Sequence, residues 1–163
     1  MDRIYAPWRS EYIKNPGGKE CIFCRAARAK SDKECYVLLR GKYSLVIMNI
    51  YPYNSGHIMI APYKHTGDLG DLTNDEMSEL MSYSQVWEAV IREAMNPEGF
   101  NMGMNIGRIA GAGVLDHLHI HLVPRWSGDT NFMPIIGETK VIPMSLEESY
   151  ELLKSTYEKQ FKN

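Results

Sequence analysis

The segment 117–124, which reads HLHIHLVP, alternates three histidines with apolar residues. In an extended strand, side chains at positions i, i+2 and i+4 project from the same face. The pattern therefore predicts a strand with three imidazoles on one face, roughly 6.5 to 7 Å apart along it. Clustered imidazoles bind metals or, when neutral, act as nucleophiles and proton carriers. The alternative interpretation is a structural strand whose histidines have no chemical role. The intervening residues, expected to enter the core, are Leu118, Ile120 and Leu122.

A glycine-rich stretch, residues 103–113, lies just before this strand. Backbone amides at Gly111, Ala112 and Gly113 can approach phosphate oxygens because little side chain stands in the way. Most glycine-rich loops only turn the chain, so the glycines alone are weak evidence for anion binding. Their position directly before the histidines strengthens that evidence. The sequence predicts a phosphate-contacting loop followed by a strand of imidazoles.

Three imidazoles in this spacing, followed by two apolar residues, resemble the signature of the histidine-triad family of nucleotide hydrolases and transferases. The resemblance covers most of the chain. Residues 49–57, NIYPYNSGH, resemble the family's ribose-contacting strand and the turn that follows it. The stretches 105–113 and 116–133 are similar to a bacterial branch associated with diadenosine tetraphosphate phosphorolysis. The family fold is α+β, and its members usually pair as homodimers.

The resemblance implies a role for each histidine of the segment. His119 is expected to be the nucleophile, attacking the α-phosphorus of a nucleotide to give a covalent nucleotidyl-imidazole. His121 is expected beside the phosphate, where it stabilises charge or manages the bridging oxygen, and His117 is the third member of the triad. His57, at the end of the turn, is expected to be a core or turn histidine.

The implied nucleotide-binding residues lie on both sides of the site. Asn49 matches the position that hydrogen-bonds the ribose hydroxyls, with a strand-end turn residue as the alternative. Asn105 matches the position that faces the phosphate, and Gly111, Ala112 and Gly113 offer backbone donors. The loop after the catalytic strand, within 126–144, is expected to shape the pocket of a second nucleotide.

The chain departs from familiar hydrolases of the family at two positions. Gly113 stands where they often carry glutamine, and Val114 stands where some carry serine. Without those side chains an incoming phosphate ion has room, so phosphorolysis of a dinucleoside polyphosphate to ADP and ATP is favoured over hydrolysis. The alternatives are a hydrolase of dinucleoside polyphosphates or nucleoside phosphoramidates, a low-turnover nucleotide-binding module, and a triple-histidine metal hydrolase.

A second constellation has the ligand types of a structural zinc site. Cys21 and Cys24 form a Cys-x-x-Cys pair, and His65 and His117 supply imidazoles. The related galactose-phosphate uridylyltransferases use similar positions, so the resemblance also implies zinc. A redox pair or buried thiols are the alternatives, although no thioredoxin-like βαβ pattern surrounds the pair. Cys35 is expected to be an ordinary buried thiol.

Composition limits the remaining possibilities. A chain of 163 residues with 44% hydrophobic residues is expected to form a single domain over 1–163. A net charge of −2 gives no overall attraction to nucleic acid or to an anionic membrane. Three cysteines, an odd number, favour reduced thiols or a metal over a disulfide scaffold. The sequence shows no signal-peptide pattern and no apolar span, so the expected location is cytoplasmic. Residues 1–20 read as an irregular arm in which Trp8 and Arg9 are expected to pack on the body, with contact to a ligand as the alternative.

The pattern of elements indicates an α+β fold. A short helix over 21–30 is followed by strands at 36–39, 43–48 and 57–61. A long amphipathic helix begins at a capping box, Thr73 to Glu76, and ends at Asn96-Pro97. Strands at 100–106 and 117–123 complete an antiparallel sheet of about five strands, and a second capped helix runs from Ser145 to about Gln160.

Overall fold

The computed structural model describes residues 20–129, 136 and 141–161. The expected arm, with Trp8 and Arg9, lies outside these residues apart from residue 20, as do 130–135 and 137–140 of the loop after the last strand. In the part of the chain that is described, no helix is long and apolar enough to cross a membrane. The elements in order are α2 (Ile22–Arg28), β1 (Val37–Arg40), β2 (Ser44–Met48), β3 (Ile58–Pro62), α3 (Asn74–Met95), β4 (Gly99–Gly103), β5 (Ile120–Arg125) and α5 (Leu146–Phe161), with short 3-10 turns at Lys33–Cys35 and Leu69–Asp71.

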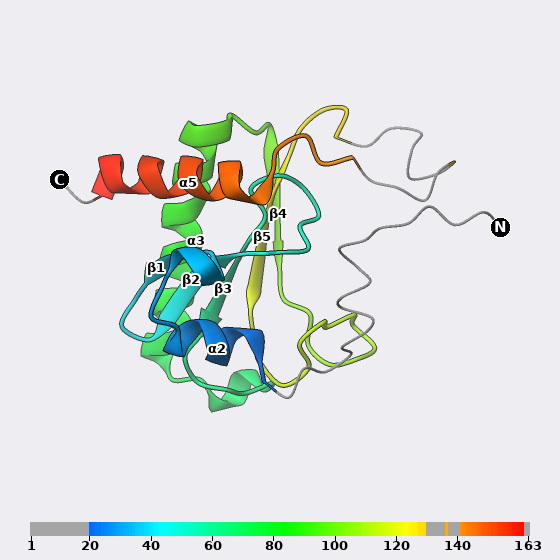
Figure 1. Ribbon diagram of the computed structural model, residues 1–163. Coiled ribbons are helices and arrows are strands. Elements are labelled where there is room, and N and C mark those ends of the chain that lie inside the picture. The colour runs from blue at the N-terminus through cyan, green and yellow to red at the C-terminus, as the bar shows by residue number, and fades with distance from the viewer. Residues whose placement is uncertain (1–19, 130–135, 137–140, 162–163) are drawn as a thin grey trace.

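The five strands form one antiparallel sheet in the order β1-β2-β3-β5-β4 (Figure 1). Alternation along β2 divides its side chains between two cores. Val46 and Met48 pack on one face with residues of α3 and α5, whereas Leu45 and Ile47 pack on the other face with Phe23 of α2. The α+β fold expected from the sequence is confirmed, with α2 covering one face of the sheet and α3 and α5 the other.

The long helix α3 begins and ends where its sequence signals predict. Thr73 Oγ1 accepts a hydrogen bond from the Glu76 amide at 3.2 Å, and Glu76 Oε2 accepts one from the Thr73 amide at 2.7 Å. These reciprocal bonds satisfy two amides that the first turn leaves without helical partners. Asn96 ends the helix in the left-handed region, with φ of 47°, and Pro97 follows.

The C-terminal helix α5 secures the outer strand β1. Tyr150 Oη donates to the Val37 carbonyl at 3.2 Å, and Lys154 Nζ donates to the Leu38 carbonyl at 2.8 Å. Ser145 and Glu148 form the predicted capping box at its start. These bonds satisfy carbonyls at an edge of the sheet, which would otherwise be open to pairing with another chain.

Two strand boundaries differ from the sequence prediction by three residues, and the others differ by at most two. The strand expected at 117 begins at Ile120, and the strand expected over 100–106 runs from Gly99 to Gly103. The first difference arises because the Leu118 amide donates to the Thr66 carbonyl at 2.7 Å, which draws residues 117–119 toward the segment after β3. Leu118, Ile120 and Leu122 are all buried as expected, and the rings of His117 and His119 contact Phe23 of α2.

Candidate active site and metal site

The three alternating histidines gather on the α2 face of the sheet. The ring centroids of His119 and His121 lie 4.7 Å apart. Phe23, a fully buried residue of α2, contacts the rings of both His117 and His119, with centroids 5.0 and 4.8 Å away. The helix that carries the cysteine pair therefore forms one wall of the imidazole cluster.

Hydrogen bonding selects the tautomer of His119. Its Nδ1 lies 2.9 Å from the His117 carbonyl oxygen, which only accepts, so Nδ1 carries the proton and Nε2 keeps a lone pair. Burial lowers the pKa of His119, and the bond to the carbonyl opposes this only in part. The ring is therefore neutral near pH 7, the state in which imidazole is a nucleophile.

His121 is oriented by His57, a residue outside the triad. The Tyr53 amide and Asn49 Nδ2 both donate to His57 Nδ1, at 3.0 and 3.3 Å. The proton of His57 therefore lies on Nε2, which donates to His121 Nδ1 at 3.0 Å. His121 in turn carries its proton on Nε2.

Burial keeps both members of this pair neutral. Burial and then the neighbouring His121 lower the pKa of His57 to about 3. Burial and then His119 lower the pKa of His121 to about 4. The expectation that His57 is a core histidine is right about its burial but missed its contact with the triad. The contact arises because β3 pairs with β5, with Ile58 opposite Leu122. Local sequence patterns do not predict this strand order.

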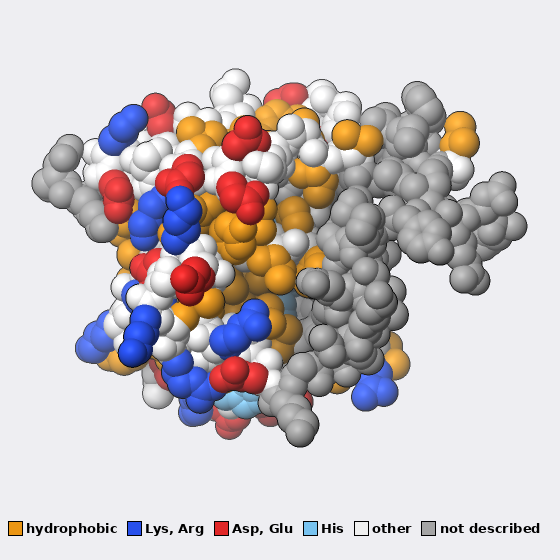
Figure 2. Space-filling model, in the orientation of Figure 1, with side chains coloured by type: hydrophobic (Ala, Val, Ile, Leu, Met, Phe, Trp, Pro, Cys, Tyr) orange, Lys and Arg blue, Asp and Glu red, His pale blue; other side chains and the backbone are white. Residues whose placement is uncertain are grey.

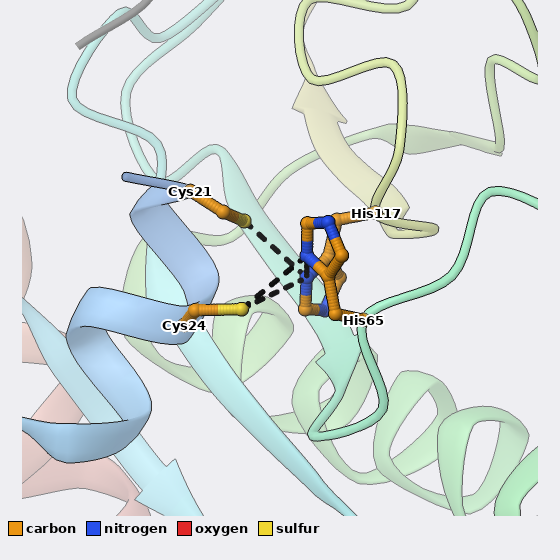
Figure 3. Close-up of side chains that lie close together, drawn as sticks. All are labelled: Cys21, Cys24, His65 and His117. Carbon is orange, nitrogen blue, oxygen red and sulfur yellow. Dashed lines mark hydrogen bonds between the residues drawn. The ribbon is translucent and has the colours of Figure 1, made fainter. Parts of the chain in front are cut away.

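The four residues expected to bind a metal converge (Figure 3). Their ligand atoms all lie within 4.8 Å of one another. His117 Nδ1 lies 3.3 Å from Cys21 Sγ and 3.7 Å from Cys24 Sγ. His65 Nδ1 lies 3.3 Å from Cys24 Sγ and 3.1 Å from His117 Nδ1.

The protonation of His117 suits a ligand. Its Nε2 donates to the Pro62 carbonyl at 2.8 Å, so Nδ1 presents a lone pair to the other three ligand atoms. Two thiols and two imidazoles at these separations fit a tetrahedral zinc ion. Cys35 lies outside this cluster and is half-buried, not fully buried as expected.

The residues expected to bind nucleotide lie at two places. Asn49 directly follows β2, and its Oδ1 accepts from the Tyr51 amide at 2.9 Å while Nδ2 reaches His57. Gly103 ends β4 opposite His121, so the glycine-rich loop starts beside the triad. Within that loop Asn105 Nδ2 donates to the Gly111 carbonyl at 3.4 Å, not to an imidazole. Gly107 and Gly111 have φ of 82° and 84°, values that favour glycine.

A pocket of about 170 Å³ lies between α2 and the strands. Figure 2 shows hydrophobic side chains gathered on this face of the molecule, between α5 and α2. Met48 and Ile50, the neighbours of Asn49 in the chain, both line the pocket. The other lining residues are Ile22, Arg25, Ala26, Glu34, Cys35, Tyr36, Ile47 and Met59.

An antiparallel sheet of five strands that presents alternating imidazoles beside a glycine-rich loop defines the class of histidine-triad proteins. The HIT domain family model matches residues 30–128, and the chain belongs to this family. It is 40% identical over 168 residues to the AP-4-A phosphorylase of Mycobacterium tuberculosis, covering 98% of this chain and 86% of that protein.

Two further similarities widen the comparison. The chain is 30% identical over 105 residues to the adenosine 5'-monophosphoramidase of Schizosaccharomyces pombe, covering 64% of this chain and 74% of that protein. The crystal structure of a Zn-bound histidine triad family protein from Mycobacterium smegmatis superposes with a TM-score of 0.68 at 26% identity, covering 86% of this chain and 95% of that one.

Proposed function

We propose that this protein is a nucleotidyltransferase that cleaves dinucleoside polyphosphates such as diadenosine tetraphosphate with inorganic phosphate. The observation that carries the proposal is the unprotonated Nε2 of His119, fixed by the bond from its Nδ1 to the His117 carbonyl. The 40% sequence identity to the AP-4-A phosphorylase of Mycobacterium tuberculosis supports the choice of substrate and of acceptor.

In the first step, His119 Nε2 attacks an α-phosphorus. A phosphorus–nitrogen bond forms, the bond to the bridging oxygen breaks, and ATP leaves with the electron pair of that bond. The protonated Nε2 of His121 is a donor suited to the oxygens of the phosphate, where it balances the charge that develops. The covalent adenylyl-imidazole divides one difficult displacement into two easier ones.

In the second step, an oxygen of inorganic phosphate attacks the same phosphorus. The phosphorus–nitrogen bond breaks, ADP is released, and Nε2 recovers its lone pair. Gly113 and Val114 favour phosphate as the acceptor because neither brings a polar side chain to the phosphate loop, and Val114 packs against the apolar cluster around Phe23.

We further propose that the nucleoside lies against the pocket beside β2. Asn49 lies in the chain between Met48 and Ile50, which line the pocket, and its amide is suited to ribose hydroxyls; the apolar lining offers a base a surface to stack on. Asn105 and the backbone of Gly111, Ala112 and Gly113 are proposed to contact the phosphates, because their loop starts opposite His121.

Zinc is the metal proposed for Cys21, Cys24, His65 and His117. When bound there it supplies structural cross-linking between α2 and the start of the catalytic strand. Thiol ligands need a reducing environment, which supports a cytoplasmic location.

A homodimer is proposed as the assembly. β4 is the outer strand of the sheet on one side, and Met102 within it is 51% exposed, so a second copy of the chain has apolar surface to cover. Met102→Glu is expected to shift the mass measured by light scattering from dimer to monomer. A wild-type protein that runs as a monomer at micromolar concentration would contradict the assembly.

Chromatographic analysis of products from diadenosine tetraphosphate, with and without inorganic phosphate, tests the function. ADP and ATP formed only when phosphate is present are the expected result. AMP and ATP formed regardless of phosphate would make the protein a hydrolase. Cleavage of a nucleoside phosphoramidate alone would place it with the phosphoramidase.

A further inference from the structure

A buried carboxylate outside the imidazole cluster has donors from two distant parts of the chain. The Asp129 side chain, which follows β5, is only 8% exposed. Its Oδ2 accepts from Arg125 Nε at 2.6 Å and from the Trp126 amide at 3.2 Å, and its Oδ1 accepts from Arg125 Nη2 at 2.9 Å. Oδ2 also accepts from Asn54 Nδ2 at 2.7 Å, which joins the loop after β5 to the turn before β3.

The turn that Asp129 holds is the one that orients His57. Asn54 is 6% exposed, and its Nδ2 also donates to the Pro124 carbonyl at 3.0 Å. The carbonyl of Asn54 accepts from the His57 amide at 3.2 Å. The residue before it, Tyr53, supplies the amide that donates to His57 Nδ1.

Arg125, Asp129 and Asn54 form what we call the clamp. The ionic pairing of Arg125 with Asp129 suits a fixed geometry. Arg125 meets both carboxylate oxygens, and its Nη1 donates to Asn101 Oδ1 on β4 at 2.7 Å. Such two-point, charge-assisted pairing restricts orientation more than a single neutral bond does. The hydrogen bonds from Arg125 hold the pKa of Asp129 well below its usual range, so the carboxylate stays ionised near neutral pH.

We propose that Asp129 is a positioning residue for nucleotidyl transfer. Through Asn54 it holds the turn in which the Tyr53 amide keeps the proton of His57 on Nε2, and His57 then keeps the proton of His121 on its own Nε2. Loss of the clamp releases the Tyr53 amide and leaves His57 Nδ1 with the longer bond from Asn49 Nδ2, at 3.3 Å. Both rings then exchange tautomers, so His121 presents its donor to the phosphate for only part of the time. The role rests on the proposed function, whereas the tautomer of His57 exists without any substrate.

Asp129→Asn is the first variant. The asparagine NH2 group replaces one carboxylate oxygen, so a donor faces Arg125 or Asn54, which are themselves donors, and one of those hydrogen bonds is lost. Asn54→Ala is the second, since it removes the link to the turn and leaves the pair between Arg125 and Asp129 in place. Glu98→Gln is the matched control. Glu98 accepts from the Ser127 amide at 2.8 Å and anchors the same loop without reaching the turn.

Two measurements separate positioning from general loss of structure. The first is the tautomer of His57 and His121, read from the 15N shifts of their ring nitrogens at pH 7 in the full chain without nucleotide. Asp129→Asn and Asn54→Ala are expected to give mixed tautomers, while Glu98→Gln keeps the wild-type shifts. The second is steady-state kinetics with diadenosine tetraphosphate and phosphate, where both variants are expected to lose roughly 10- to 100-fold in kcat with KM within about threefold.

The outcomes are distinct. Wild-type tautomers in both Asp129→Asn and Asn54→Ala would overturn the proposal whatever the kinetics. A raised KM with unchanged kcat would overturn it too and assign the loop to substrate binding. If the wild-type protein does not turn over diadenosine tetraphosphate, the function fails while the shifts still decide the role of Asp129. If Asp129→Asn does not fold, Asn54→Ala decides alone.

Discussion

His57 Nε2 lies 3.0 Å from His121 Nδ1, and the proton between them belongs to His57, because its other ring nitrogen accepts from the Tyr53 amide. His121 therefore carries its own N–H on Nε2, the ring nitrogen that does not bond His57. A histidine that precedes β3 thus decides which atom of a histidine in β5 acts as a donor.

Replacing His57 separates its hydrogen bond from its bulk. His57→Leu fills the same space without a donor and is expected to slow adenylylation of the protein by roughly 10- to 100-fold in single-turnover kinetics. His57→Gln is expected to recover part of the rate, because its amide can donate to His121 Nδ1. Equal rates for the two variants would show that packing, not the hydrogen bond, is what His57 provides.

His119 is expected to be indispensable for chemistry but not for binding. His119→Asn removes the Nε2 lone pair and is expected to lower kcat by at least about 10³-fold, as the loss of a covalent nucleophile does elsewhere. Isothermal titration with a nucleotide is expected to change little, and intact-protein mass spectrometry should find the adenylyl adduct only in the wild type. Turnover within tenfold of wild type would remove His119 from the nucleophile role.

Acid is expected to destabilise the fold through the buried imidazoles. The pKa of His57 is about 3 in the folded protein and near 6.5 when unfolded. Between these values only the unfolded chain is protonated at this site, so stability falls as pH falls from 6.5 toward 3 and is unaffected by His57 above that range. The cost is about 1.4 kcal/mol per pH unit for His57.

Urea unfolding at pH 7, 6 and 5 checks this slope. His57→Gln cannot take up a proton there, so its unfolding free energy is expected to fall less steeply than that of the wild type. The titrating groups that do not contact His57 are common to both proteins and cancel in the comparison, whereas His121, which bonds His57, contributes to the difference. Parallel pH profiles for the two would mean that His57 has the same pKa in the folded and unfolded states.

The zinc proposal is tested with two cysteines. Cys24→Ser is expected to lower bound zinc, measured by mass spectrometry of the metal, and to lower the thermal midpoint, because one of the ligand atoms is lost. Cys35→Ser changes a thiol outside the cluster and is expected to keep both values. A chelator should bring the wild type toward the Cys24→Ser midpoint. Protein prepared with zinc that holds none would contradict the assignment.

Local signals in the sequence were sufficient for most of the elements. The capping boxes at Thr73 and Ser145 involve residues within one helical turn, so they can be predicted from the sequence without knowledge of the fold. The boundary at Ile120 was not, because it depends on a hydrogen bond between Leu118 and Thr66, which are far apart in the chain. Contacts between distant segments set the details that periodicity leaves open.

The sequence by itself determined the identities and spacing of the triad, the grouping of its three rings on one face and the four ligand types of the metal cluster. Each follows from strand periodicity or from the chemistry of the side chains. Only the tertiary structure decided the protonated nitrogen of each imidazole. That choice depends on the Pro62 carbonyl, the His117 carbonyl and the ring of His57, acceptors and donors whose positions follow from strand pairing and the course of the chain before β5.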